Sequence, residues 1–190
     1  MLRPSTPSAK SRRNALTSAT LHPRGDAKTN LELCAVWALA SARPGDRQLQ
    51  ELIEHRPAGQ TRERVVIGEE GGVLLDLLPG LKDHSCSLGR PGGFVERLQD
   101  GTWLGHVAEH AAIALQRETG AHVYRGKTRG SGESGRYNVI YGYGEERVAL
   151  EAGRLAVRLV NHLVEPEVGF DFLNELESLI LLAERRAFGP

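Results

Sequence analysis

The chain has 190 residues, of which 40% are hydrophobic and 25% are charged. These values are ordinary for a globular protein, and the length allows one domain with a tail or at most two small domains. Lys plus Arg and Asp plus Glu both number 24, so the formal net charge is zero. We therefore expect no nucleic-acid partner, because such a partner calls for a basic excess over the folded part.

The two cysteines, Cys34 and Cys86, lie in no CxxC spacing and no paired framework. Reduced thiols and a cytoplasmic location are the simplest interpretation. No apolar run approaches the roughly 20 residues that cross a bilayer, and the N-terminus lacks the apolar core of a secretory signal. We expect no membrane partner.

Residues 1–30 differ in composition from the rest of the chain. They are rich in Ser, Thr, Pro and Ala, and their six basic residues face a single acid, Asp26. Such a stretch buries too little apolar surface to fold alone, which predicts a disordered basic tail. An organelle transit peptide has the same composition and remains an alternative.

The segment 31–70 carries weaker signals. A helical spacing of apolar residues predicts a helix within 31–52, interrupted at Pro44-Gly45. A short helix over 46–55 and a strand over 62–67 follow in the prediction. The apolar residues that carry the first helix are Leu33, Val36, Trp37 and Ala40.

From residue 72 the signals become stronger. Apolar residues predict a helix over 73–78, followed by a loop over 85–93 with turn residues. A long helix is predicted over 102–119, with Thr102 as its N-cap and Gly120 just past its end. Trp103, at the start of this helix, is expected to pack in the core or against the helix end.

The remaining chain alternates between the two kinds of element. Strands are predicted over 121–125 and 137–143, joined by a Gly/Ser-rich loop over 126–135. Helices are predicted over 145–163 and 172–186. Intermixed helices and strands indicate an α+β fold, with a small, mostly antiparallel sheet and helices packed on one of its faces.

The motif with the clearest chemistry lies on the 102–119 helix, where His106 and His110 are four residues apart. That spacing places both imidazoles on one helix face, where they can share a tetrahedral zinc ion. Glu109 points to nearly the same side and can act as a general base. The order His-x-x-Glu-His is that of the inverted zinc peptidases. The alternative is an ordinary i,i+3 side-chain pair between His106 and Glu109 on an exposed helix face.

Two other groups of residues attract attention. His84 and Cys86 could form a metal pair, but a packing role in the loop is favoured because no second pair matches them. A cluster of cations surrounds the 126–135 loop and could bind carboxylates of an acidic polymer. The alternative is a solvated charged hairpin. The cations are Arg125, Lys127, Arg129 and Arg136.

Several motifs, in order over about residues 74–188, resemble the N-terminal domain of cyanophycin synthetase. The longest run is Gly101-Thr-Trp-Leu-Gly-His-Val-Ala-Glu-His110. Others are 77–81 (LLPGL), 84–87 (HSCS), 92–98 (GGFVERL), 126–129 (GKTR), 137–141 (YNVIY), 154–159 (RLAVRL), 170–171 (FD) and 175–176 (EL). The resemblance makes 71–190 a domain of this type and 31–70 its poorly matched N-terminal part.

The resemblance implies a function. Cyanophycin is an aspartate polymer with arginine on each side-chain carboxylate, and the family's N-terminal domain binds the polymer and in some members cuts it as a zinc metallopeptidase. Carried over to this sequence, His106 and His110 are zinc ligands and Glu109 is the general base. Glu175 is the expected third ligand, with Glu177 and Glu151 as rivals.

Two departures from the family qualify this expectation. The chain stops near where the ATP-grasp and ligase domains of the synthetase would begin, and it has no GxxxxGK[ST] loop. We therefore expect that ligase chemistry, if it is used, comes from separate subunits. The alternatives to a zinc peptidase are a non-catalytic polymer-binding module and a truncated relic of a synthetase.

Overall fold

The computed structural model describes residues 29–39, 48–57, 69–130, 136–164 and 166–188. The predicted tail lies almost wholly outside these residues, and the strand predicted over 62–67 lies entirely outside them. None of the helices in the described part of the chain is long and apolar enough to cross a membrane.

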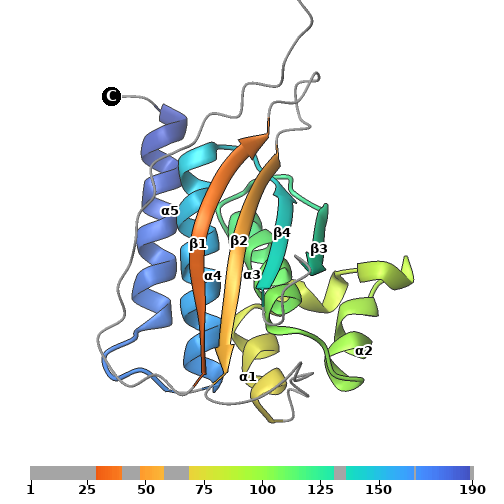
Figure 1. Ribbon diagram of the computed structural model, residues 1–190. Coiled ribbons are helices and arrows are strands. Elements are labelled where there is room, and N and C mark those ends of the chain that lie inside the picture. Colours follow the sequence, from red (N-terminus) through yellow and green to blue (C-terminus); the bar gives the residue numbers. More distant parts are fainter. Residues whose placement is uncertain (1–28, 40–47, 58–68, 131–135, 165, 189–190) are drawn as a thin grey trace, which may run out of the picture.

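The described strands form one antiparallel four-stranded sheet in the order β1-β2-β4-β3 (Figure 1). Two of them come from the N-terminal segment and two from the middle of the chain. A register shift between Leu33 and Ala35 interrupts the pairing of the first two strands. The strands are β1 (Thr29–Leu39), β2 (Gln48–Pro57), β3 (Gly126–Gly130) and β4 (Arg136–Gly142).

The helices predicted within 31–52 and over 46–55 are wrong, because the described residues of both ranges lie in β1 and β2. The apolar spacing of a short segment does not separate a helix from a strand. Here long-range pairing decides the conformation. β2 pairs with β1 on one side and with β4 on the other, over Gln48 to Glu54 on the β4 side.

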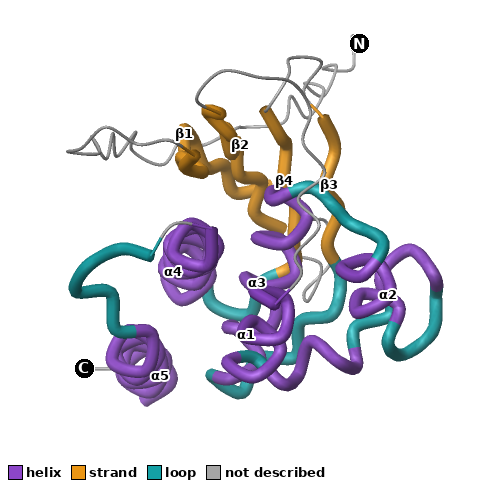
Figure 2. Tube along the Cα trace, turned by 90° about the horizontal axis from the view of Figure 1, so that it is seen from below, coloured by secondary structure: helices purple, strands orange, loops and turns teal. Residues whose placement is uncertain are grey.

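The helices lie on one face of the sheet (Figure 2). α3 and α4 pack against the sheet and against each other, and α5 packs on α4. The helices are α1 (Glu69–Leu77), α2 (Gly93–Gln99), α3 (Leu104–Glu118), α4 (Glu146–Val164) and α5 (Phe172–Phe188), with short 3-10 turns η1 (Pro79–Asp83) and η2 (Cys86–Leu88). The predicted α+β class, with an antiparallel sheet covered on one face, is confirmed.

The core lies between the sheet and the α3–α4 layer. The inward side of β4 buries Tyr137, Val139 and Tyr141, which confirms the predicted alternation along this strand. The Tyr141 hydroxyl donates a hydrogen bond to the carbonyl of Ala149 on α4, at 3.2 Å. Along α3 small residues allow close packing, and a Cβ at Gly105 would lie 2.6 Å from the Tyr137 ring.

Three local predictions need correction. The strand predicted over 121–125 has no strand pairing, and β3 occupies part of the predicted 126–135 loop. The N-cap of α3 is Trp103, which makes no side-chain cap bond, rather than Thr102. Trp103 is also not a core residue, since 47% of its surface is exposed.

Candidate metal centre

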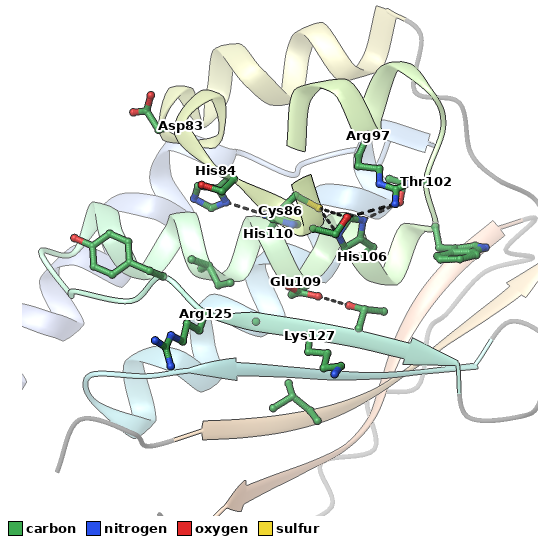
Figure 3. Close-up of a pocket in the computed structure, with 18 of the residues that line it drawn as sticks. Asp83, His84, Cys86, Arg97, Thr102, His106, Glu109, His110, Arg125 and Lys127 are labelled. Carbon is green, nitrogen blue, oxygen red and sulfur yellow. Dashed lines mark hydrogen bonds between the residues drawn. The ribbon is translucent and has the colours of Figure 1, made fainter. Parts of the chain in front are cut away.

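Helix α3 presents the His-x-x-Glu-His motif to a pocket beside the edge of the sheet (Figure 3). His110 and Glu109 are buried at 5% and 4% exposure, and His106 is half-buried. The rings of His106 and His110 are 4.7 Å apart at their centroids. The helical spacing thus places both imidazoles and the carboxylate at one site, as predicted.

Cys86, at the start of η2, completes a group of three metal-ligating side chains. Its Sγ lies 3.3 Å from Nε2 of His106. One ligand atom each from Cys86, His106 and His110 lies within 4.8 Å of the others, close enough to hold one metal ion. Zinc bonds of about 2.3 Å to sulfur and 2.0–2.1 Å to nitrogen in a tetrahedron separate the two ligand atoms by roughly 3.5 Å. The observed spacing is near that value.

The loop conformation directs the thiol toward the helix. Cys86 has a φ of 50°, in the left-handed region that non-glycine residues seldom adopt. Such a backbone is retained only where the surroundings enforce it, and it often marks a functional site. The packing role expected for Cys86 and His84 therefore understates what they do, because both side chains contact the histidines of the motif.

Each motif histidine has a partner on its Nδ1 atom. Thr102 Oγ1 lies 2.7 Å from Nδ1 of His106. His84 Nδ1 lies 2.9 Å from Nδ1 of His110, whose ring also stacks on Phe94. A donor bond from Nδ1 leaves Nε2 with its lone pair for a metal, and such outer partners commonly fix ligating histidines.

The charge state of the histidines also suits a metal. Burial, with a smaller contribution from the positive charge of Arg97, lowers the pKa of His106 to about 4. Burial is the main cause that lowers the pKa of His110 well below its usual value. Both imidazoles are therefore neutral at pH 7, which is the form that binds metals.

Glu109 lies between the histidines and strand β3. Burial raises the pKa of its carboxyl to about 7, although a hydrogen bond from Thr128 acts in the opposite direction. Thr128 Oγ1 donates this bond to Oε2 at 2.6 Å. Glycine is required at 126, because a Cβ there would lie 2.5 Å from Oε1 of Glu109. A carboxyl with a pKa near neutrality can both accept and donate a proton.

The residues present fit a zinc ion. One thiol and two imidazoles form a nitrogen–sulfur donor set, which suits zinc. Magnesium and calcium prefer oxygen ligands instead. His84 Nε2 is buried without a hydrogen-bond partner, so His84 is held by its contact with His110 and not by a separate network. The structure therefore supports a site that can hold a metal ion, formed by Cys86, His106 and His110.

The pocket around this site has a volume of about 990 Å³, which is space for several residues of a polymer and more than a single amino acid needs. Basic side chains exceed acidic ones in its lining. The cations are Arg97, Arg117, Arg125 and Lys127, and the acids are Asp83 and Glu109. The pocket also includes Trp103 and Tyr124 among its exposed aromatic residues.

Some predicted residues lie elsewhere. Glu175 is on α5, where it forms a 2.7 Å ion pair with Arg158. It belongs neither to the metal-ligating group nor to the pocket lining. Its rival Glu151 is paired with Arg154 on α4. The structure therefore does not bring Glu175 or Glu151 to the two histidines, and Cys86 is the third potential ligand that lies close to them.

The predicted basic cluster divides in the structure. Arg125 and Lys127 line the pocket, whereas Arg129 is exposed on β3 outside the lining. Arg136 begins β4, and its side chain lies outside the described part of the structure. Substrate binding by Arg125 and Lys127 stays a prediction, which their place in the pocket lining allows. The sequence gave no indication that Thr102 and Thr128 are the hydroxyl partners of the motif.

Comparison with known proteins places the chain in a family. The profile of the cyanophycin synthase-like N-terminal domain matches residues 63–165. The cyanophycin synthetase of Geminocystis herdmanii is 42% identical over 119 residues, which are 62% of this chain and 14% of that protein. That of Crocosphaera subtropica is 44% identical over 104 residues, 55% of this chain and 12% of that protein. The match therefore spans about one seventh or less of these relatives.

Proposed function

The chain belongs to the cyanophycin synthase-like N-terminal domain family, and from this premise we propose that it binds cyanophycin, or a related aspartate–arginine polymer, and cleaves it as a zinc metallopeptidase. The observation that carries the proposal is the convergence of Cys86, His106 and His110 next to the buried carboxylate of Glu109. A zinc ion held by the three side chains would polarise the scissile carbonyl and lower the pKa of water to about 7.

The residues of the chain divide the remaining tasks. Thr128 donates a hydrogen bond to Oε2 of Glu109, whereas Oε1 accepts no hydrogen bond from a described residue. Oε1 is therefore the atom that takes the proton of the attacking water and returns it to the leaving amine. Thr102 and His84 fix the orientation of the two imidazoles through their Nδ1 atoms.

The basic lining orients the polymer in this account. Arg125 and Lys127 lie on the β3 side of the pocket, where they can bind carboxylates of the substrate (Figure 3). The cytoplasm is the compartment in which we place the reaction. A thiol ligand is consistent with that compartment, because thiols stay reduced there.

The experiment that tests this proposal compares metal content and cleavage. Purified wild-type protein should contain about one zinc per chain, and His106→Ala should lose it, because the imidazole is replaced by a methyl group. The zinc-loaded wild type should shorten cyanophycin, and the variant should not. Absence of zinc from the wild type after incubation with zinc would reject the peptidase.

A second candidate is a polymer-binding module without catalysis. The excess of cations in the pocket favours it, since these side chains alone can hold the carboxylates of a polymer. This function predicts binding that survives a chelator and weakens as salt rises, because charge pairing at an open pocket is screened. Loss of polymer binding after the metal is removed by a chelator would instead show that binding depends on the metal.

A further inference from the structure

Strand β3 is an edge strand that lies beside the candidate site. It pairs with β4 on one side, and no other described strand lies on its opposite side. Figure 1 shows β3 at the rim of the sheet, with α2 beyond it. An unpaired edge offers main-chain donors and acceptors that another extended chain can use.

The register shows which main-chain groups of β3 turn away from β4. Gly142 donates its N–H to the carbonyl of Arg125 at 2.9 Å. Antiparallel ladders alternate, so every second residue turns its N–H and C=O to the same neighbour. From Arg125 onward, Lys127 and Arg129 therefore face β4, where they lie opposite Ile140 and Asn138. It follows that residues 126, 128 and 130 turn their N–H and C=O outward.

Two of these three outward-facing residues, Gly126 and Thr128, also contact the candidate general base. Thr128 donates to Glu109, and the missing side chain of Gly126 makes room for it. Gly126, Lys127 and Thr128 line the pocket. Figure 3 shows Lys127 and its strand on one side of the pocket, and Cys86 and His106 on the other. A chain lying along this edge would run beside the two residues of β3 that contact Glu109.

The charges of the pocket indicate the chemistry of such a chain. Four cations and two acids line the pocket, and one of the two acids is the buried Glu109. A chain that bears carboxylates is favoured there over one that bears ammonium groups. No ion pair joins Arg125 or Lys127 to another described residue, so both can pair with the bound chain.

We propose that the pocket binds an extended, carboxylate-bearing peptide chain as an additional strand on the free edge of β3, with hydrogen bonds to the main chain of Gly126, Thr128 and Gly130. The inference deepens the proposed function, on which it rests for the use of the pocket as a substrate site. Strand pairing of this kind sets both the direction and the register of the bound chain, and it would therefore position a peptide bond in the pocket.

Amide hydrogen exchange tests the proposal directly. The probe is a blocked aspartate decapeptide, added to the full-length Glu109→Gln protein so that it is not cut. At ten times its Kd, the peptide should slow exchange about tenfold at the amides of Gly126, Thr128 and Gly130. The amides of Lys127 and Arg129 already face β4 and should change less than about twofold.

Several results would overturn strand addition. One is a decapeptide that binds without this alternation, and another is a decapeptide that does not bind or binds no better than a lysine decapeptide. A third is protection of the same amides on raising the protein concentration without peptide, which would mean that a second copy of this chain occupies the edge.

A matched pair of variants adds a second test at Gly130, where no atom lies within 4 Å of an added Cβ. Gly130→Pro removes the outward N–H, a change that edge strands tolerate because the ladder bonds remain. It should weaken binding of the aspartate decapeptide about 3- to 10-fold, the effect of one hydrogen bond. Gly130→Ala keeps the N–H and should bind as the wild type, whereas equal affinities of the two variants would contradict the proposal.

The outcomes separate this inference from the proposed function. A protein that lacks zinc and cleaves nothing, but shows the alternating protection, keeps the strand addition and loses the peptidase. A protein that binds zinc and cleaves, but shows no alternation, keeps the peptidase and loses the strand addition.

Discussion

Helices α3 and α5 each carry a glutamate near basic or metal-ligating residues, yet the two side chains end in opposite environments. Glu109 on α3 is 4% exposed, and no cation pairs with it, so burial raises its pKa to about 7. The Glu175 side chain on α5 is 38% exposed and pairs with Arg158 at 2.7 Å. A desolvated carboxyl costs stability, and proteins keep such groups mainly where chemistry uses them.

The contrast between Glu109 and Glu175 predicts that the largest effect of a substitution is on catalysis, at Glu109. Glu109→Gln keeps the shape of the side chain but removes the proton acceptor, so the rate of polymer cleavage should fall about 10²- to 10⁴-fold. Glu175→Gln is the matched control and should stay within about twofold of the wild type. Equal losses in the two variants, measured by release of polymer fragments, would break the distinction between the helices.

A smaller effect is expected at His84, the partner of His110. His84→Phe keeps an aromatic ring but removes the contact to Nδ1 of His110, and zinc affinity should fall about 10- to 100-fold, as is usual for partners of ligating histidines. Competition with a zinc indicator would measure the change. His122→Phe replaces an exposed histidine outside the pocket lining and should leave the affinity unchanged.

The contact between β3 and α3 can be tested through stability. Gly126→Ala would place a Cβ 2.5 Å from Glu109 Oε1, and the resulting overpacking should lower the free energy of unfolding by about 1–3 kcal/mol. Gly130→Ala on the same strand meets open space and should change it by less than about 0.5 kcal/mol. Denaturant unfolding of both variants decides whether Glu109 is held as tightly as the structure indicates.

The smallest effect is predicted on α5. Glu175→Ala breaks a partly exposed ion pair with Arg158, which should change the free energy of unfolding by about 0–1 kcal/mol. Zinc content should remain at the wild-type level. A variant that loses zinc would restore Glu175 as a ligand and remove the contrast between the two helices.

The sequence predicted those parts of the fold and site that depend on local spacing. The long helices have clear apolar stripes, and the 3.6-residue period places His106, Glu109 and His110 on one face without any tertiary knowledge. The predicted helix over 102–119 is confirmed as α3, and those over 145–163 and 172–186 are confirmed as α4 and α5, each within a few residues.

The parts that failed depend on contacts between distant segments. The segments of β1 and β2 were predicted as helices because their apolar spacing is ambiguous, and only the pairing of β2 with β1 and with β4 fixes the conformation. Cys86 lies 20 residues before His106, on a separate turn, and no local pattern reports such a distance. The signal that was available was the presence of two metal-ligating residue types, His84 and Cys86, in one glycine-flanked loop.

The glycines that begin and end β3 were assigned to a loop from the sequence, and this prediction was wrong. Gly126 and Gly130 were read as loop residues, whereas Gly126 is needed because Glu109 approaches its Cα closely. A glycine in a strand often marks such an approach. The local sequence therefore described the strand incorrectly, although the residue itself belongs to the candidate site.

The most direct test of the central claim is X-ray absorption at the zinc edge of the zinc-loaded protein. The account predicts one sulfur near 2.3 Å, from Cys86, together with nitrogen ligands near 2.0–2.1 Å, from His106 and His110. A first shell of nitrogen and oxygen only, unchanged in Cys86→Ser, would contradict the account, because the metal would then be held without the thiol.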